Sequence, residues 1–173
     1  YSHLFSFPVT GLRFFTVYGP WGRPDMALFK FTKAILDKKP IDIFNNGNMR
    51  RDFTYIDDIT NGIIRCLANI PDLDHNWNSN CPDPASSGIA AYQIFNIGNN
   101  LPVNLMDCIS ILENKLGRKS IKNYMPMQPG DVEASWASAE ELIQNINYSP
   151  KTSIKTGIQN FVDWYIDYYG ISL

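Results

Sequence analysis

The sequence predicts an α/β fold in which strands and helices alternate around one sizeable core. Runs of β-branched and aromatic residues end at Gly, Pro or Asn turn signals, and segments with apolar residues at helical spacing follow them. The chain has 173 residues, of which 45% are hydrophobic and 18% are charged. This composition is sufficient for one folded domain and argues against a disordered or fibrous chain.

The first expected strand covers residues 9–17, because the run VTGLRFFTV is rich in β-branched and aromatic residues and precedes a Tyr-Gly-Pro turn. A helix is expected over residues 25–39. Pro24 and Asp25 are typical of a helix start, and Pro40 follows the expected end. The first part of the chain therefore has the order strand, turn and helix.

Two short strands are expected next, over residues 41–44 and 51–55, on either side of an Asn-Asn-Gly turn. We expect the two strands to lie close in space. A helix then begins at Asp57 or Asp58, either of which can cap it, and runs until Pro71. The apolar residues that give this helix its 3.6-residue period are Ile59, Ile63, Ile64, Leu67 and Ile70.

Residues 72–90 form a polar loop, for which a variable insertion is the default interpretation. Residues 91–98 are strand-like. Asn104, followed by Asp107, opens a helix that Gly117 ends. This part of the chain again alternates strand and helix.

The C-terminal part is expected to be extended over residues 121–127 and then to form two helices. Ser138 and Glu141 have the spacing of a capping box for a short helix. A last helix has apolar residues at Ile154, Ile158, Phe161, Tyr165 and Tyr169.

Composition excludes several classes of function. The formal net charge of −2 at pH 7 offers no basic field for nucleic acid. The three cysteines lack metal-site or disulfide-framework spacing, and the two histidines lie far apart. No apolar run is long enough for a bilayer, and the first residues show no signal pattern. We therefore expect a cytoplasmic chain without a metal site, and its first residue looks like an internal position.

The residues alone do not make a catalytic apparatus. The one close glycine pair before a helix is Gly19-x-x-Gly22, which is no dinucleotide-binding fingerprint. Neither histidine has a neighbour pattern typical of a general base, and a surface role is favoured for both. Asp57 and Asp58 are better explained as helix caps than as metal ligands.

Lone polar groups at strand and loop ends remain as candidate ligand-binding residues. Arg23 lies in a Gly/Pro-rich loop and Arg51 at a strand start, so each could present its guanidinium to a phosphate or carboxylate. A solvated or structurally paired side chain is the more common role of a lone arginine. Phe44 could stack on a base, although a core position is the more common role of such an aromatic residue.

Four sequence blocks occur in a recognisable order: GLRFFTVYGPWGRPDMA, IDIFNNGNMRRDFTYIDDI, FNIGNN and MPMQPGDVEASWAS. Together they resemble the C-terminal half of UDP-glucuronate 4-epimerases. These enzymes belong to the extended short-chain dehydrogenase/reductase superfamily of NAD-dependent nucleotide-sugar epimerases and dehydratases. The resemblance covers almost the whole chain.

The resemblance implies the last strands and helices of a Rossmann-type parallel sheet plus a small α/β substrate-binding subdomain. Residues 1–173 would be the C-terminal part of such an enzyme, without the N-terminal NAD-binding part. The family's glycine-rich loop and catalytic Tyr-x-x-x-Lys precede this segment, and no tyrosine here has a lysine four residues later. We therefore expect no catalytic residue in this segment and no activity from it alone, with NAD bound mainly by the missing part.

The resemblance also assigns binding residues. Phe44 matches the residue that lies against uracil, Arg51 and Arg23 match diphosphate ligands, and Gln128 and Asp131 match residues at the ribose and diphosphate end of UDP. The residues that match the strand end near the nicotinamide of NAD are Phe14, Phe15 and Val17.

Thr16 stands where hexose epimerases commonly have Asn, and this departure favours a uronate. Its hydroxyl could donate a hydrogen bond to the sugar carboxylate without adding charge. The implied activity interconverts UDP-glucuronate and UDP-galacturonate through a 4-keto sugar, as a homodimer that supplies surface-polysaccharide precursors. Alternatives are a UDP-sugar decarboxylase or dehydratase of the same superfamily, a non-catalytic nucleotide-sugar-binding module, or a proteolytic remnant.

Overall fold

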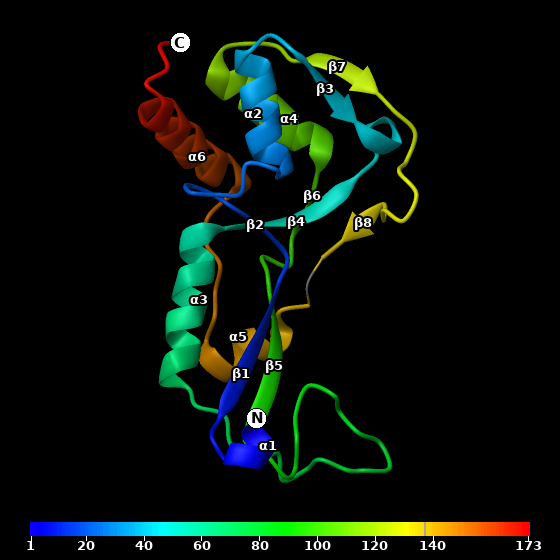
Figure 1. Cartoon of the computed structure of the whole chain (residues 1–173), viewed down its shortest axis with the longest axis vertical. Helices are drawn as coiled ribbons and strands as arrows, with labels where there is room; N and C mark the ends of the chain where they lie inside the picture. Colours follow the sequence, from blue (N-terminus) through cyan, green and yellow to red (C-terminus); the bar gives the residue numbers. More distant parts are fainter. Residues whose placement is uncertain (137) are drawn as a thin grey trace.

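The structure is a computed structural model that describes residues 1–136 and 138–173. It is an elongated α/β arrangement in which helices and short strands alternate (Figure 1). The helical and strand elements are α1 (Ser2–Phe5), β1 (Val9–Phe14), β2 (Thr16–Tyr18), α2 (Ala27–Leu36), β3 (Pro40–Ile43), the 3₁₀ turn η1 (Phe44–Gly47), β4 (Arg50–Tyr55), α3 (Ile56–Ala68), β5 (Tyr92–Ile97), β6 (Pro102–Asn104), α4 (Leu105–Leu116), β7 (Ile121–Tyr124), β8 (Ala134–Ser135), α5 (Glu140–Ile146) and α6 (Ile154–Tyr169).

In the described part of the chain the strands form three small sheets, and most strand pairs are parallel. β1 pairs with β5, β2 with β4, and β3 with β7, all in parallel. β4 is the central strand of the middle sheet, because it also pairs with β8 in parallel and with β6 in antiparallel orientation. The prediction of a mixed α/β fold with parallel strands is confirmed.

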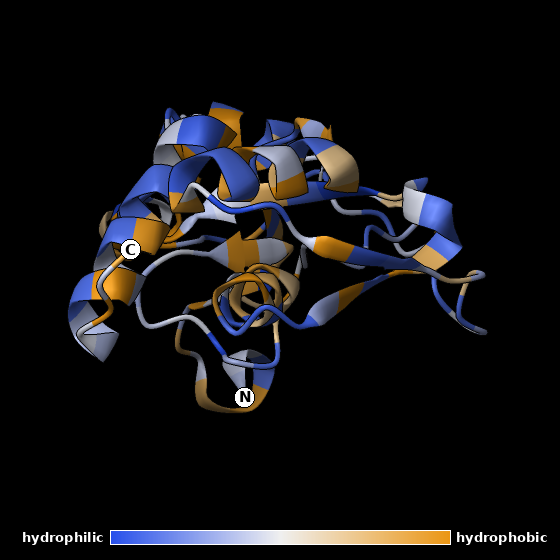
Figure 2. Cartoon of the chain, turned by 90° about the horizontal axis from the view of Figure 1, so that it is seen from above, coloured by the Kyte–Doolittle hydropathy of each residue, from blue (hydrophilic) through white to orange (hydrophobic). Residues whose placement is uncertain are grey.

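Among the described residues, two hydrophobic clusters stabilise the two ends of the molecule. The larger one joins α2, α4 and α6 to β3 and β4, with Ile43, Leu112 and Val162 fully buried. The smaller one joins α3 and α5 to β5 around Ile97 and Leu142. Hydrophilic and hydrophobic segments alternate along the helices of the larger end in Figure 2, as expected for helices that bury one face.

The strand expected over residues 9–17 is present but divided. β1 ends at Phe14 and β2 begins at Thr16. Because of this break, one continuous segment contributes a strand to each of two sheets. The expected helix over residues 25–39 is shorter, as α2, and the long C-terminal helix is present as α6. The strands expected over 41–44 and 51–55 are β3 and β4, which belong to different sheets and do not pair with each other.

The predicted N-caps of α3 are wrong, whereas α4 begins after Asn104 and ends at Gly117 as expected. The N-cap of α3 is Tyr55, so Asp57 and Asp58 lie in the first turn, where a carboxylate is favourable beside the positive helix end. Asp58 instead accepts hydrogen bonds from the backbone N–H groups of Lys151 and Thr152, at 3.2 and 3.0 Å. It therefore ties the start of α3 to the segment before α6.

Two further expectations need correction. The N-cap of α5 is Ala139, so Ser138 does not cap it. Along α3 the apolar period does not mark a single buried face, because Ile64 and Leu67 are 60% and 76% exposed while Ile59 is buried. None of the described helices is long and apolar enough to cross a bilayer.

Glu113 joins the end of α4 to β7. Its carboxylate is 5% exposed and accepts hydrogen bonds from Lys119 Nζ at 2.9 Å, Ser120 Oγ at 2.6 Å and Lys122 Nζ. Burial raises the pKa of Glu113, but the donors from Lys122, Ser120 and Lys119 outweigh it and lower the pKa to about 2. The charged form is therefore the one that the fold stabilises.

We predict that Glu113→Gln lowers the free energy of unfolding by about 3 kcal/mol at neutral pH. A carboxyl whose pKa falls from 4.5 in the unfolded chain to about 2 in the fold stabilises fully above pH 4.5. This contribution is lost as the pH falls from 4.5 towards 2. Urea unfolding across this range should show the gap between wild type and variant closing.

Glu140→Gln is the matched control, because Glu140 is exposed in the first turn of α5. Its effect should be small at every pH. An equally large gap for Glu113→Gln at pH 2 and pH 7 would contradict a charge-based role for this carboxylate.

Candidate functional site

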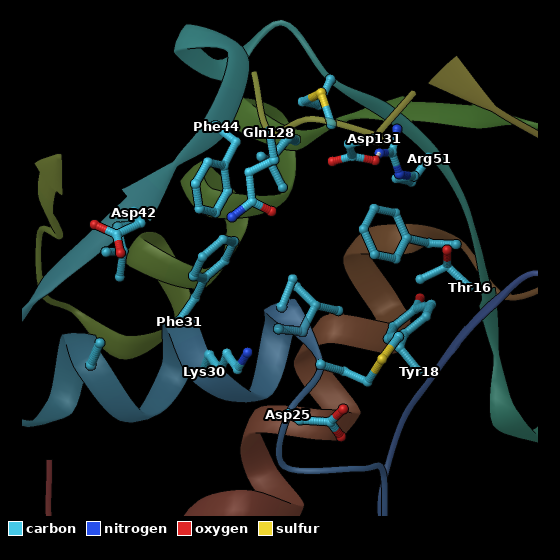
Figure 3. Close-up of a pocket in the computed structure, with 18 of the residues that line it drawn as sticks. Thr16, Tyr18, Asp25, Lys30, Phe31, Asp42, Phe44, Arg51, Gln128 and Asp131 are labelled. Atoms are coloured by element: carbon cyan, nitrogen blue, oxygen red, sulfur yellow. Dashed lines mark hydrogen bonds and ion pairs between the residues drawn. The ribbon is translucent and has the colours of Figure 1, made fainter. Parts of the chain in front are cut away.

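A cavity of about 640 Å³ opens between α2 and the strand ends of the sheets (Figure 3). Its volume lies in the range typical of sites for small molecules and cofactors. Residues from β2, α2, β3, η1, β4 and the segment that follows β7 line it. Six of the nine residues that the sequence selects lie on its wall, namely Thr16, Val17, Phe44, Arg51, Gln128 and Asp131.

Arg51 is held rigidly on one wall. It lies in β4, and its side chain is 19% exposed. Nη2 donates to Asp131 Oδ1 at 2.8 Å, while Nη1 donates to the carbonyl oxygens of Arg50 and Glu133 at 3.0 and 3.1 Å. These bonds use three of the five guanidinium N–H donors, so two remain for a ligand.

Asp131 positions the guanidinium of Arg51, a role that the sequence alone does not reveal. The same Oδ1 that accepts from Arg51 also accepts the backbone N–H of Val132 at 2.8 Å. The carboxylate therefore orients the guanidinium and neutralises part of its charge. Because carboxylate oxygens only accept, Asp131 can contact a ligand hydroxyl but repels a phosphate.

The opposite wall is aromatic. Phe44 follows β3 directly and is half-buried, and in Figure 3 Phe31 of α2 and Gln128 lie beside it. The chain turns sharply after Phe44, because Asn45 and Asn46 both have left-handed backbone conformations, with φ of 49° and 51°. Asn tolerates this conformation better than most residues, which explains its place in the turn.

Thr16 and Val17 bring β2 to the same cavity. Thr16 pairs in register with Phe53 of β4, so the β2–β4 ladder sets its distance from Arg51 two residues earlier. Both Thr16 and Val17 are half-buried on the wall. A hydroxyl here adds a hydrogen-bonding group without a charge.

Three selected residues do not line the cavity. Arg23 has a side chain that is 76% exposed, and it donates two hydrogen bonds to Asp25, at 3.0 and 2.6 Å. Hydrogen bonding from Arg23 holds the pKa of Asp25 below its ordinary value. Phe14 is exposed at the end of β1, and Phe15 lies in the break between β1 and β2.

Sequence reasoning missed the contribution of α2. Ala27, Lys30, Phe31 and Ala34 all line the cavity, and their spacing of three or four residues is that of one helix face. The amphipathic period of this helix was the available signal, but period alone does not tell a ligand-facing stripe from a core-facing one. Lys30 adds a second cation to the site.

Tyr18 also lines the cavity and was missed. Burial raises the pKa of Tyr18 well above its ordinary value, so the phenol stays protonated at neutral pH.

Lys30 and Arg51, aromatic surface and hydroxyl groups line the cavity together with three carboxylates, those of Asp25, Asp42 and Asp131. Asp25 pairs with Arg23, and Asp131 pairs with Arg51. This mixture suits a ligand that has both anionic groups and hydroxyl groups, as a nucleotide does. Among the described residues, no group of three or more His, Cys, Asp or Glu side chains could hold a metal ion.

Comparison with known proteins identifies the family. The chain is 54% identical over 169 residues to Protein CapI of Staphylococcus aureus, covering 98% of this chain and 50% of that protein. It is 44% identical over 172 residues to the Probable UDP-glucuronate 4-epimerase of Rhizobium meliloti, again covering 98% and 50%. The chain thus spans about half the length of these relatives.

The fold of the chain also matches about half of a longer solved structure. The UDP-glucuronic acid 4-epimerase from Bacillus cereus, in complex with UDP-glucuronic acid and NAD, superposes with a TM-score of 0.77 at 33% identity. The match covers 96% of this chain and 48% of that one. Residues 1–98 match the NAD dependent epimerase/dehydratase family, and the chain belongs to this family.

Proposed function

We propose that the whole protein interconverts UDP-glucuronate and UDP-galacturonate with NAD, and that this chain is its C-terminal, substrate-binding part. The observation that carries the proposal is the convergence of Thr16, Phe44 and Arg51 on one cavity. Relatives named as UDP-glucuronate 4-epimerases match almost the whole chain and support the choice of substrate. The NAD-binding part would precede this chain.

The cavity suits each part of the nucleotide sugar. The uracil ring would lie against Phe44, and the two remaining N–H donors of Arg51 would meet the diphosphate. Asp131 would orient Arg51 and accept a hydrogen bond from a ribose hydroxyl, with Gln128 close to Phe44. UDP-glucuronate carries about three negative charges, for which charge-assisted bonds contribute roughly 1.5 to 3 kcal/mol each. Lys30 would add attraction from α2.

The residues near β2 fit the edge of a bound cofactor. Val17 offers apolar surface on the cavity wall beside Thr16, and Phe14 offers exposed aromatic surface at the end of β1. Phe14, Phe15 and Val17 would therefore lie towards the nicotinamide. Bound NAD supplies reversible oxidation at C4 of the sugar, which produces the 4-keto sugar that can be reduced from either face.

Thr16 would hold the sugar carboxylate. A 4-keto uronate is a β-keto acid, and it loses CO2 when the bond from its carboxylate carbon aligns with the carbonyl π system. The bonding pair then forms an enolate, and protonation gives a 4-keto pentose. A hydrogen bond from Thr16 Oγ would hold the carboxylate group out of that alignment.

We further propose that the whole protein is a homodimer that works in the cytoplasm and supplies precursors of surface polysaccharides. The support for this setting is the resemblance of the four sequence blocks to UDP-glucuronate 4-epimerases. The test of the activity is NMR of the anomeric protons of UDP-glucuronate incubated with the whole protein and NAD. Appearance of UDP-galacturonate would support the proposal, and no turnover would contradict it.

We predict that Arg51→Ala in the whole protein weakens UDP binding by about ten- to a hundredfold, as expected for loss of a charge-assisted hydrogen bond. Calorimetry measures the effect directly. Arg50→Ala is the matched control, because Arg50 is exposed, does not line the cavity and precedes Arg51 on the alternating strand. Equal affinities for wild type and Arg51→Ala would remove Arg51 from the site.

We predict that Thr16→Val changes the product and not only the rate. Valine keeps nearly the same shape but cannot donate a hydrogen bond, so the 4-keto uronate should lose CO2 and the enzyme should release a UDP-pentose. Thr16→Ser retains the hydroxyl and should keep UDP-galacturonate as the product. The measurement is NMR of the sugar protons, and an unchanged product from Thr16→Val would refute the role of this hydroxyl.

A further inference from the structure

A second cavity, of about 440 Å³, lies at the C-terminal end of α2 and carries a concentration of positive charge. It shares no lining residue with the cavity of about 640 Å³ that contains Phe44 and Arg51, which we call the nucleotide cavity. The residues that line it are Ile35, Lys38, Lys39, Arg118, Lys119 and Ile121. We call it the basic cavity.

Two matching helix-to-strand turns bring these cations together. α2 leads into β3 and α4 into β7, and the two strands run parallel with Pro40 opposite Ile121. Both turns close with the same backbone bond across five residues, Lys39 N–H to Ala34 O at 2.8 Å and Arg118 N–H to Glu113 O at 3.2 Å. Each turn therefore delivers two cations to the same edge of the sheet.

The ion pairs around the basic cavity do not neutralise it. Lys39 pairs with Asp37 at 3.5 Å, and Lys119 pairs with Glu113 at 2.9 Å. Both carboxylates are already shared, Asp37 with Lys33 and Glu113 with Lys122.

Six cations therefore face two carboxylates and two helix C-termini, and each helix C-terminus carries about half a negative charge. The six cations are Lys33, Lys38, Lys39, Arg118, Lys119 and Lys122. About three positive charges remain, in a chain whose formal net charge is −2. Such a local excess is favourable where an anion binds and otherwise costs electrostatic repulsion.

Stabilisation of the two helix ends does not explain this arrangement. A cation near a helix C-terminus is favourable, but Lys38 occupies the left-handed position of its turn, with φ of 56°. The equivalent position after α4 is Gly117, with φ of 62°. Because Gly adopts this conformation without steric cost, fold stability alone favours Gly over Lys at position 38. The lysine there adds a charge at the expense of backbone strain.

Arg118 adds a further positive charge, and its side chain is held in place. Its Nη1 donates to the carbonyl oxygen of Leu36 at 3.1 Å, which fixes the guanidinium between the two turns. Lys38 forms no ion pair within the part of the chain that the structure describes. Ile121, which is 56% exposed, adds apolar surface beside these charges.

We propose that the basic cavity binds the phosphate or diphosphate group of a soluble small molecule, at a site distinct from the nucleotide cavity. The fixed guanidinium of Arg118 and the ammonium groups of Lys38, Lys39 and Lys119 contact the phosphate oxygens. The exposed side chain of Ile121 contacts the apolar part of the ligand.

The test is an NMR titration of the isotope-labelled whole protein with inorganic pyrophosphate, at a constant ionic strength of about 0.15 M. Amide signals of Lys38, Gly117 and Arg118 report on the basic cavity, and the amide of Arg51 reports separately on the nucleotide cavity. The first three signals should shift and saturate. Lys38→Gly and Arg118→Gln should each weaken this binding by about tenfold.

The variant Lys38→Gly removes a charge from the basic cavity without weakening the fold, so it tests binding alone. Gly suits the left-handed position, so this variant should unfold at the same temperature as wild type or at a higher one. Lys151→Gln removes one exposed charge away from the basic cavity and should leave pyrophosphate binding unchanged. Loss of binding by a fully folded Lys38→Gly protein would therefore support the proposal.

Three results would overturn it. The Lys38, Gly117 and Arg118 signals could stay in place or shift without saturation. Lys38→Gly could bind pyrophosphate as tightly as wild type, which would leave the cations a role at the helix ends alone. Cosedimentation with phosphatidylglycerol vesicles, without saturable pyrophosphate binding, would assign the surface to a lipid headgroup instead of a soluble compound.

Discussion

The pairing of β4 with three other strands is the constraint on which the rest of the structure depends. Side chains alternate along β4, so Arg51 and Phe53 face the nucleotide cavity while Asp52 points away and is fully buried. A buried carboxylate is costly unless it is hydrogen-bonded, and Asp52 accepts the backbone N–H groups of Asn99 and Asn100 at 3.2 and 3.0 Å. These bonds tie β4 to the segment between β5 and β6.

The same strand explains why the cavity is suited to a ligand before one binds. The ladder with β2 places Thr16 opposite Phe53, and the pairing with β8 lies beside the contact between Arg51 and Asp131. A guanidinium that is already oriented loses less entropy when it meets a phosphate. Rigid placement of a few polar groups against an aromatic wall is therefore the physical basis of the proposed specificity.

Local patterns in the sequence predict the elements that bury a continuous apolar face. α6, α4 and β5 follow their patterns closely, because helical or strand spacing and terminal Gly signals decide them within a few residues. β6 and β8 are only three and two residues long and exist because β4 offers them backbone partners. No local pattern encodes such pairing.

In the site, too, some residues can be predicted from local sequence and others depend on tertiary packing. Residues at strand ends, such as Thr16, Phe44 and Arg51, could be selected from the sequence, with the help of a family resemblance. The face of α2 could not, because only tertiary packing decides whether Lys30 and Phe31 meet a ligand or a core. Arg23 was selected by its motif, whereas in the structure it does not line the cavity, and its guanidinium pairs with Asp25, which does.

We propose that this cavity holds the UDP part of a nucleotide sugar between Phe44 and Arg51. A crystal structure of the whole protein with UDP-glucuronate and NAD tests it most directly. We expect the uracil ring against Phe44, the diphosphate on Arg51 and the sugar carboxylate within hydrogen-bonding distance of Thr16 Oγ. A nucleotide bound elsewhere, or in this cavity with its diphosphate away from Arg51, would contradict it.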